Sequence, residues 1–326
     1  MIVINQKQVK SLLPLKDIRK VVSAVEKAFG DYGKGMVQMP PKKYLLFPKW
    51  NGDLRIMPSF SEPLKMAGTK IVNVHPDNPK KGLKTVMASI LLNDPTNGMP
   101  VALMDGTYIT LVRTGAAGAV ASKYLARKDA SRLGVIGGGQ QAISQICAIA
   151  SVRKLRDIKV YDLNPKTLDN LEKVLKPLGI KFQRAQTMEE ACDCDILVTT
   201  TPSRKPIVKN EWIKPGTHIN AIGADAEGKE ELDPEILKNS KIIIDDWAQA
   251  SHSGEINIPV AKGLISEKDI YAGLGDIVAG KKPGRTDEKS ITVFDSTGLG
   301  VQDLYTAAMV YKLAKSAKAG KDIELI

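Results

Sequence analysis

The pattern of hydrophobic and polar positions changes character near residue 127. Before that point, an amphipathic helical pattern precedes short apolar runs that turn-forming residues separate, which is typical of strands joined by tight turns. The helical pattern covers 16–29, and the predicted strands cover 42–47, 53–58, 68–74, 85–93 and 100–105.

From residue 128 onward, strand-like runs alternate with helical stretches. Helical patterns at 165–179 and 233–240 lie between apolar runs, and a long helix is predicted after the last run, at 299–319. This alternation predicts an α/β fold in which helices cover both faces of a doubly wound parallel sheet. The predicted strands are 133–137, 158–162, 180–185, 195–200, 217–223, 241–246 and 290–295.

The composition excludes several classes of function. The chain has 326 residues, 5% aromatic residues and a net charge of +11, but its lysines are scattered, so we expect no nucleic-acid partner. No apolar run approaches about 20 residues and the N-terminus lacks a signal-peptide layout, which predicts a cytoplasmic protein without a membrane span. The cysteines Cys147, Cys192 and Cys194 form no C-x-x-C pair, so neither a disulfide framework nor a metal site is expected.

Three consecutive glycines, 137–139, stand between the apolar run LGVI and a helical segment. Gly137 permits a tight turn, Gly139 lets the backbone approach a pyrophosphate, and Ala142 lets the helix pack close to the strand. The N–H groups at the start of that helix favour a bound phosphate. The G-x-G-x-x-A spacing in this strand–helix context predicts a dinucleotide-binding Rossmann domain. Without that context, the same residues would indicate only an ordinary glycine-rich turn.

The next predicted strand ends in Asp162, which indicates the kind of dinucleotide. A carboxylate at this place accepts hydrogen bonds from the ribose 2′-hydroxyl and repels a 2′-phosphate. Leu163 and Asn164 follow, with no arginine beside them to hold such a phosphate. The pattern therefore favours NAD over NADP.

Polar residues follow two later strands, where ligands of such sheets bind. Asp225 comes just after the strand at 217–223, and Ser296 comes just after the strand at 290–295. Both have an ordinary alternative as helix caps or turn residues. We regard Asp225 as a candidate functional carboxylate in the ligand crevice and Ser296 as a candidate contact to the nicotinamide amide.

The first region offers cations in strand context. Lys70 shares a predicted strand face with valines, and desolvation there would bring its pKa toward neutrality, as proton transfer requires. Its alternative is an edge-strand lysine that prevents aggregation. The guanidinium of Arg55 could bind a substrate carboxylate or form a surface salt bridge. Arg113 and Thr114 precede a small-residue helix that can pack near phosphates. The histidines at 75, 218 and 252 show no ligand spacing and receive no role.

Long motifs give the chain a family resemblance. It resembles the ornithine cyclodeaminase/mu-crystallin family, in particular its archaeal alanine dehydrogenase branch, over essentially its whole length. The resemblance implies a discontinuous α+β substrate-binding and dimerisation domain, 1–127 plus 298–326, and a Rossmann domain, 128–297. It also implies a homodimer in which the sheets of two first domains join. The motifs are DLRIMPSF, AGTKIVNVHPDNPKKGLKTVMA, VRTGAAGAVASKYLAR, VIGGGQQA, VTTTPSRKPIV, HINAIGAD and VFDSTGLGVQD.

The resemblance also assigns roles to individual residues. The catalytic positions fall on Lys70 and Asp225, and the substrate carboxylate is assigned to Arg55 with Lys70. One departure is the loop GGGQQA, which has glutamine where relatives carry threonine, so the phosphate contact can differ. The cofactor positions are Arg113, Thr114, Gly137, Gly139, Gln140, Gln141, Asp162, Leu163, Asn164, Gly223, Ala224, Asp225 and Ser296.

The implied activity is reversible, NAD-dependent oxidative deamination of L-alanine to pyruvate and ammonium. Lys70 and Asp225 would share the proton transfers, and the sequence leaves open which of them activates water. Two enzymatic alternatives are ornithine cyclodeamination and reduction of cyclic ketimines, and a third reading is a non-enzymatic, crystallin-like NAD(P)-binding protein. In each enzymatic case the partner is a small amino acid, keto acid or imine.

Overall fold

The computed structural model describes residues 1–324 and contains two compact units. One unit comprises Met1–Arg113 and the chain from Leu299 onward, and the other comprises Thr114–Gly298. The division falls inside helix α3 (Gly106–Leu125), upstream of the boundary at 127 and 128 that the sequence pattern indicates. The functional assignment of the two units remains a prediction.

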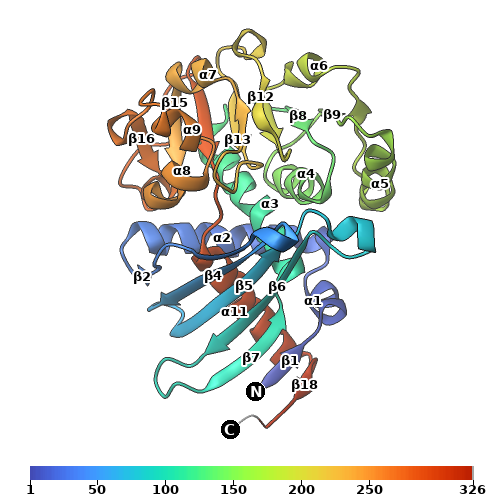
Figure 1. The fold of residues 1–326 in the computed structure, drawn as a ribbon, viewed down its shortest axis with the longest axis vertical. Helices are drawn as coiled ribbons and strands as arrows, with labels where there is room; N and C mark the ends of the chain where they lie inside the picture. Colours follow the sequence, from blue (N-terminus) through green and yellow to red (C-terminus); the bar gives the residue numbers. More distant parts are fainter. Residues whose placement is uncertain (325–326) are drawn as a thin grey trace. The chain divides into compact units, whose positions relative to one another are not determined.

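The first unit is built on a mixed sheet of eight strands (Figure 1). Neighbouring strands are antiparallel except β1 and β7, which run parallel. The strand order is β18 (Lys321–Asp322), β1 (Ile2–Ile4), β7 (Pro100–Asp105), β6 (Val86–Asn93), β5 (Met66–Val74), β4 (Gly52–Ser61) and β2 (Val37–Gln38), with β3 (Lys43–Phe47) also paired to β4.

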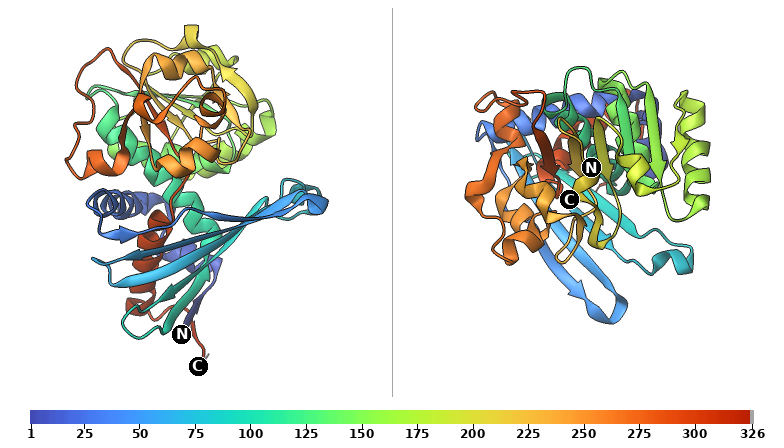
Figure 2. Two further views of the ribbon diagram at one scale, coloured as in Figure 1. Left: turned by 60° about the vertical axis from the view of Figure 1, so that its left-hand side comes forward. Right: turned by 90° about the horizontal axis from the view of Figure 1, so that it is seen from above.

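Helix α11 (Gly300–Ser316) covers one face of this sheet and contacts β4, β5 and β6 (Figures 1 and 2). Helix α2 (Ile18–Gly33) packs against α11 through buried side chains that recur at helical spacing, including Val21, Val25 and Phe29. Helix α1 (Gln6–Leu12) begins at a capping box formed by Asn5 and Gln8. Helix α11 thus brings the C-terminal part of the chain back to the unit that the N-terminal part begins.

The second unit is built on a sheet of eight strands that are all parallel. Chain order reverses at β8, because β9 pairs on one side of it and β11 on the other. This is the doubly wound α/β arrangement that the alternating pattern predicts, and the predicted fold class is confirmed. The strand order is β10 (Gln183–Arg184), β9 (Asp157–Tyr161), β8 (Arg132–Ile136), β11 (Ile196–Thr199), β13 (His218–Ala221), β17 (Ile291–Asp295), β15 (Ser240–Ile244) and β16 (Ile270–Gly273).

The helices of this unit follow its strands along the chain. Their bounds are α4 (Gln140–Val152), α5 (Pro165–Leu175), α6 (Met188–Cys192), α7 (Pro234–Lys238), α8 (Trp247–Ser253), α9 (Asn257–Ala261) and α10 (Leu274–Val278). The sequence pattern misses α8, α9, strand β16 and a separate two-stranded sheet of β12 (Arg204–Val208) and β14 (Glu230–Leu232). These elements are too short for periodicity to distinguish them from loops.

Residues 1–324 contain neither a membrane-spanning helix nor a group of side chains that would hold a metal ion. None of the helices there is both long and apolar enough to span a bilayer. Within the same range, no three His, Cys, Asp or Glu side chains are grouped in a way that would hold a metal ion.

Candidate active site

Lys70 lies on the face of the first unit's sheet that α11 covers. Its cross-strand neighbours on β4 and β6 are Met57 and Ile90, so the lysine lies among apolar side chains. Only 1% of its side chain is exposed, and its Nζ lies 2.7 Å from Oδ2 of Asp303 on α11. The sequence pattern placed Lys70 correctly on a strand face with valines, but it did not identify Asp303.

Two glycines bring α11 close enough for this contact. A Cβ at Gly68 would lie 2.8 Å from the Leu91 carbonyl oxygen and 3.2 Å from Cδ1 of Leu304 on α11. A Cβ at Gly300 would lie 3.1 Å from the Met57 carbonyl oxygen. Real Cβ atoms are not accommodated at such distances without a shift. The two glycines therefore let the helix approach the strands until Asp303 reaches Lys70.

Arg113 on α3 binds the same carboxylate. Its Nε donates to Oδ1 of Asp303 at 3.0 Å, and its Nη1 donates to Oε1 of Gln302 at 2.9 Å. The sequence analysis grouped Arg113 with Thr114 at the cofactor, but its guanidinium lies beside Lys70's partner in the first unit. The main chain of Thr114 serves the second unit, since its carbonyl accepts from Nε2 of Gln145.

The cluster lowers the pKa of Lys70 to about 7. Burial is the largest cause, because it removes water from the ammonium, and the nearby positive charges of Arg113 and Lys42 act in the same direction. The charge and the hydrogen bond of Asp303 oppose them. Lys42 is itself buried and precedes β3; the predicted strand 42–47 included it, but the sequence analysis gave it no role. Lys70 therefore exchanges a proton near neutral pH, as general acid–base chemistry requires.

Arg55 lies on β4, on the same sheet face as Lys70, and pairs with a carboxylate of its own strand. Its Nε and Nη2 donate to the two oxygens of Asp53 at 2.9 and 3.0 Å. The guanidinium carbon lies 5.4 Å from the centre of the Tyr44 ring. This geometry holds the planar group in place, and the assignment of Arg55 to a substrate carboxylate stays a prediction.

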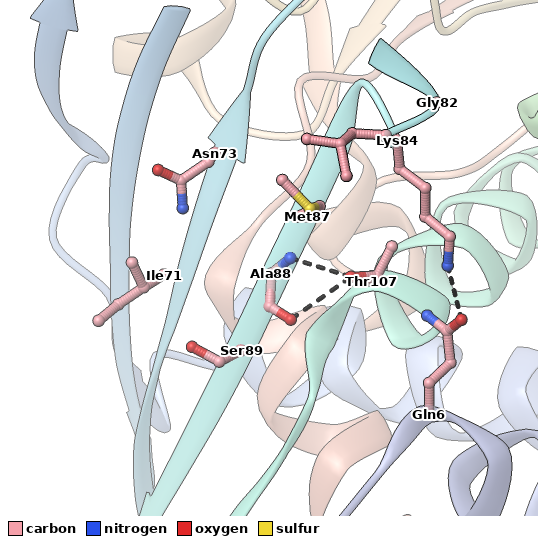
Figure 3. A pocket seen from close by; sticks show the side chains of 10 residues that line it. Gln6, Ile71, Asn73, Gly82, Lys84, Met87, Ala88, Ser89 and Thr107 are labelled. Carbon is pink, nitrogen blue, oxygen red and sulfur yellow. Dashed lines mark hydrogen bonds between the residues drawn. The ribbon is translucent and has the colours of Figure 1, made fainter. Parts of the chain in front are cut away.

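A hollow of about 560 Å³ opens on the other face of the same sheet (Figure 3). Ile71, Asn73, Met87 and Ser89 project toward it from β5 and β6, and Lys84 at its rim donates to Oε1 of Gln6. Because successive side chains of a strand point to opposite faces, Lys70 faces away from it. The hollow is therefore not the site of the candidate chemistry.

The glycine-rich loop of the second unit connects β8 to α4. Gly137 has a φ of +93°, which favours glycine, and a Cβ there would also lie 3.0 Å from the Thr200 carbonyl oxygen. Gly139 caps α4 without a side-chain hydrogen bond, and a Cβ built on it meets no atom within 4 Å. The protein's own packing does not require a glycine at 139. The open space before unbonded helix N–H groups fits a pyrophosphate.

Residues around this loop are organised as the NAD hypothesis expects. Asp162 accepts from the N–H groups of Gly138 and Asn164, each at 2.8 Å, so it orders the glycine loop as well as its own turn. Asn164 caps α5, and the Leu163 side chain is 83% exposed. Gln140 begins α4, and Oε1 of Gln141 accepts from the Ser144 hydroxyl. The residues present fit a dinucleotide whose ribose hydroxyls approach Asp162.

A buried carboxylate joins two loops at the carboxyl end of this sheet. Glu231 accepts from the N–H groups of Thr201 and Gly223 and from the hydroxyls of Thr199 and Thr201, at 2.6–2.9 Å. Burial raises the pKa of Glu231, and burial beside Glu231 raises that of Glu255 well above its usual value. The sequence pattern missed both residues because β14 is too short to show alternation.

The remaining predicted positions lie at the same strand ends. Asp225 follows β13, and its Oδ1 lies 2.6 Å from Nζ of Lys229, while Ala224 beside it is buried. Ser296 follows β17, and its N–H donates to the Ala221 carbonyl. Its buried hydroxyl has no hydrogen-bond partner within residues 1–324, which fits a polar ligand group at this edge. The catalytic and cofactor roles of these residues remain predictions.

Comparison with known proteins gives relatives over the whole chain. The family model "Ornithine cyclodeaminase/mu-crystallin family" matches residues 2–318. An alanine dehydrogenase of Archaeoglobus fulgidus is 50% identical over 323 residues, which cover 99% of this chain and 98% of the relative.

Solved structures agree with the fold. An archaeal alanine dehydrogenase dimer with bound NAD has a TM-score of 0.95 and 49% identity, covering 100% of this chain and 99% of that one. The Δ1-pyrroline-2-carboxylate reductase of Thermococcus litoralis, in complex with NADH and L-proline, has a TM-score of 0.94 and 41% identity, covering 99% and 100%.

Proposed function

The chain belongs to the ornithine cyclodeaminase/mu-crystallin family, and from this premise we propose that it is an NAD-dependent enzyme that oxidatively deaminates L-alanine. The balanced reaction is L-alanine + NAD⁺ + H₂O → pyruvate + NH₄⁺ + NADH + H⁺. The observation that carries the proposal is Lys70, a buried lysine whose pKa of about 7 suits proton transfer. The identity of 50% to an alanine dehydrogenase supports alanine as the substrate.

The cations of the first unit supply the site for the substrate carboxylate. Asp303 is a single carboxylate bound to both Lys70 and Arg113, and Lys42 adds further positive charge. While Lys70 is protonated, its charge and that of Arg113 together exceed the single charge of Asp303, and this excess attracts an anionic group. We assign Arg113 to this group together with Lys70, in place of the cofactor contact that the resemblance implies.

The protein's groups then move the protons. When bound, NAD⁺ accepts the hydride from the substrate Cα. Uncharged Nζ of Lys70 takes up a proton from the substrate ammonium group, and the carboxylate of Asp225 provides a second place for a proton during attack of water on the imine carbon. The buried surroundings of Lys70 strengthen its interactions by excluding competing water.

A cyclic ketimine reductase is the second candidate. It is supported by the similarity to the Thermococcus litoralis reductase, at 41% identity over 99% of this chain. Reduction of a cyclic imine uses the same proton and hydride positions without attack of water, so the described cation cluster is compatible with both reactions.

A substrate panel followed by NADH absorbance distinguishes these candidates. It contains L-amino acids with NAD⁺, keto acids with ammonium and NADH, and Δ1-pyrroline-2-carboxylate with NADH. We expect the highest kcat/KM with L-alanine and with pyruvate plus ammonium. A cyclic imine reduced more than about tenfold better than pyruvate would move the assignment to the second candidate, and NADH binding without turnover would favour a binding protein.

Variants connect the activity to the proposed groups. Lys70→Ala and Asp225→Ala should each lower kcat by roughly 10²-fold or more, because each removes a proton-transfer group. NADH affinity, measured by fluorescence, should change little in Lys70→Ala. The exposed Lys7→Ala serves as a control. Near-normal turnover by Lys70→Ala would exclude the mechanism, and loss of NADH binding would move Lys70 to the cofactor site.

We further propose that the protein is a cytoplasmic homodimer. The sheet face opposite α11 exposes Ile71, Met87 and Leu103 at 36%, 38% and 36%, which is unusual for neighbouring apolar side chains of one face. A second copy of the chain would cover them, as the dimeric relative supports. Three buried, unpaired thiols agree with a reducing compartment.

A further inference from the structure

Asp303 connects three segments that are distant along the chain. Its Oδ2 lies 2.7 Å from Nζ of Lys70 on β5, and its Oδ1 accepts from Nε of Arg113 on α3 at 3.0 Å. Its own side chain, on α11, is 2% exposed. Gln302 holds the other end of the same guanidinium through Nη1. Each oxygen of one carboxylate thus binds a different cation.

We propose that Asp303 is a positioning residue, which holds the Lys70 amine and the Arg113 guanidinium at a fixed separation so that both meet one substrate molecule. This inference rests on the proposed function. Asp303 itself needs no contact with the substrate, because it acts through the two cations that it binds.

The surroundings show why a carboxylate is needed at this place. The charged groups that face Lys70 are Asp303 from α11, Arg113 from α3 and Lys42 from the segment before β3, while Arg55 on β4 is paired with Asp53. Without Asp303, this set would contain cations only, and Lys70 and Arg113 would repel each other. A buried cation without a partner is strongly destabilised. Asp303 therefore allows two cations to stay close together before the substrate arrives.

The same carboxylate influences when Lys70 is protonated. Burial and the neighbouring cations lower the pKa of Lys70, and Asp303 raises it. Removing the carboxylate should lower that pKa further, because an opposite charge in contact typically contributes about 1 unit or more. A residue that merely stabilises the fold would not move this pKa.

The experiment compares Asp303→Asn with Asp303→Glu and with Tyr305→Phe in the full-length enzyme. An amide offers a single acceptor oxygen, so Asn cannot hold both cations. Tyr305 is the matched control, because it is buried on the same helix and its hydroxyl contacts Asp31 and Ser61. Measured quantities are kcat, KM, NADH affinity, thermal stability and the pH dependence of kcat/KM.

We expect Asp303→Asn to lower kcat/KM for L-alanine by roughly 10²-fold and to move its acidic limb about 1 pH unit lower. NADH affinity should stay within about threefold of wild type. Asp303→Glu should keep the acidic limb close to its wild-type position, because it keeps the charge. Tyr305→Phe should lower stability without moving the limb. An unmoved limb in Asp303→Asn, or an equal shift in Tyr305→Phe, would overturn the proposal.

Asp303→Glu keeps the proposal testable if Asp303→Asn does not fold. The additional methylene displaces the carboxylate within a closely packed site, so kcat/KM should fall at least about tenfold in a folded enzyme. Wild-type kcat/KM in folded Asp303→Glu would then contradict a positioning role.

A substrate-free measurement separates this inference from the proposed function. The ¹³Cε resonance of Lys70, assigned by its loss in Lys70→Met, is titrated in wild type and in the Asp303 variant that folds. A lowered pKa in Asp303→Asn, with most of the wild-type value kept in Asp303→Glu, supports the contact even if no substrate of the panel is turned over, in which case only the proposed reaction is wrong. An unchanged Lys70 pKa in Asp303→Asn overturns the inference even if L-alanine is the substrate.

Discussion

Lys70 on β5 and Asp162 just after β9 have very different surroundings. The Lys70 ammonium is buried among apolar side chains, with one carboxylate in contact and two cations nearby, and its pKa falls to about 7. Asp162 is half-buried and accepts hydrogen bonds from the backbone N–H groups of Gly138 and Asn164. The chemistry of a charged residue therefore depends on its contacts in the fold, which the strand pattern does not show.

Replacement of Lys70 by methionine should increase stability in a pH-dependent way. The pKa of Lys70 is about 7 in the folded protein and about 10.5 when unfolded, so the unfolded state binds more protons between these values. The loss of folding stability caused by burying Lys70 is complete below about pH 7 and disappears as the pH rises toward 10.5. The free energy of unfolding of Lys70→Met should therefore exceed that of wild type by a few kcal/mol at pH 6.5 to 7, and the difference should be smaller at pH 9.5.

Urea unfolding at several pH values measures this difference, and the exposed Lys7→Met provides the control. A difference between Lys70→Met and wild type that is independent of pH would show that Lys70 has an ordinary pKa.

Replacement of Asp162 should change cofactor preference. Asp162→Ser removes the charge that repels a 2′-phosphate. The ratio of the dissociation constants for NADPH and NADH should therefore fall at least tenfold, about 1.4 kcal/mol. Because Asp162 also accepts from the Gly138 N–H, NADH itself should bind more weakly. Fluorescence titration with both cofactors measures the two effects. Asp169→Asn on α5, which removes an exposed charge paired with Arg184, should alter neither. Preference of the wild type for NADPH would contradict the assignment.

At the scale of elements, helix α11 depends on the absence of side chains beneath it. Gly68 on β5 and Gly300 at the helix start let α11 lie close to the sheet, and Asp303 and Leu304 then face the strands. Residues 300–308 of the helix are buried all round, polar side chains such as Gln302 and Asp303 included, so its hydrophobic pattern alone does not identify the face that carries the chemistry.

Gly68→Ala should separate α11 from β5. Its Cβ would lie 2.8 Å from the Leu91 carbonyl oxygen and 3.2 Å from Leu304, so the helix or strand must move. We expect a loss of stability of about 1–3 kcal/mol and a lower kcat, because Asp303 and Lys70 move apart. Gly82→Ala, at a turn where a Cβ meets no atom but φ is +70°, is the control for stability loss without an effect on kcat. Unchanged kcat and stability in Gly68→Ala would show that the packing is not tight.

At the scale of the whole molecule, the chain forms two units, and the first of them draws on both ends of the sequence. Its sheet is covered by α11 on one face, while the other face keeps apolar side chains at the surface. A monomer would expose this apolar area to water, at a cost of roughly 25 cal/mol per Å². Association of two copies removes that cost.

Leu103→Glu should convert the proposed dimer into a monomer. The new carboxylate would lie in the middle of the uncovered face, where burial without a partner is unfavourable. Light scattering at micromolar concentration should give the mass of a dimer for wild type and of a monomer for the variant. Leu264→Glu, which changes a 43% exposed leucine of the second unit, should remain dimeric. A monomeric wild type would exclude the proposal.

The sequence by itself determined the fold class, the glycine loop and the candidates Lys70, Asp162 and Asp225. These features depend on local patterns: alternation predicts a parallel sheet, and G-x-G-x-x-A marks the turn from β8 into α4. Short elements such as β12, β14 and β16 escaped, because a few residues carry too little periodicity.

Only the tertiary structure decided which charges meet. Asp303 follows Lys70 by more than two hundred positions, and no spacing rule relates them; the contact exists because α11 returns to the first sheet over Gly68. The sequence pattern and the family resemblance assigned Arg113 to the cofactor, which stays a prediction; the fold adds that its guanidinium binds Asp303. A pKa depends on burial and on charges within a few ångströms, and the fold sets both, so the neutral-range titration of Lys70 follows from packing and not from sequence order.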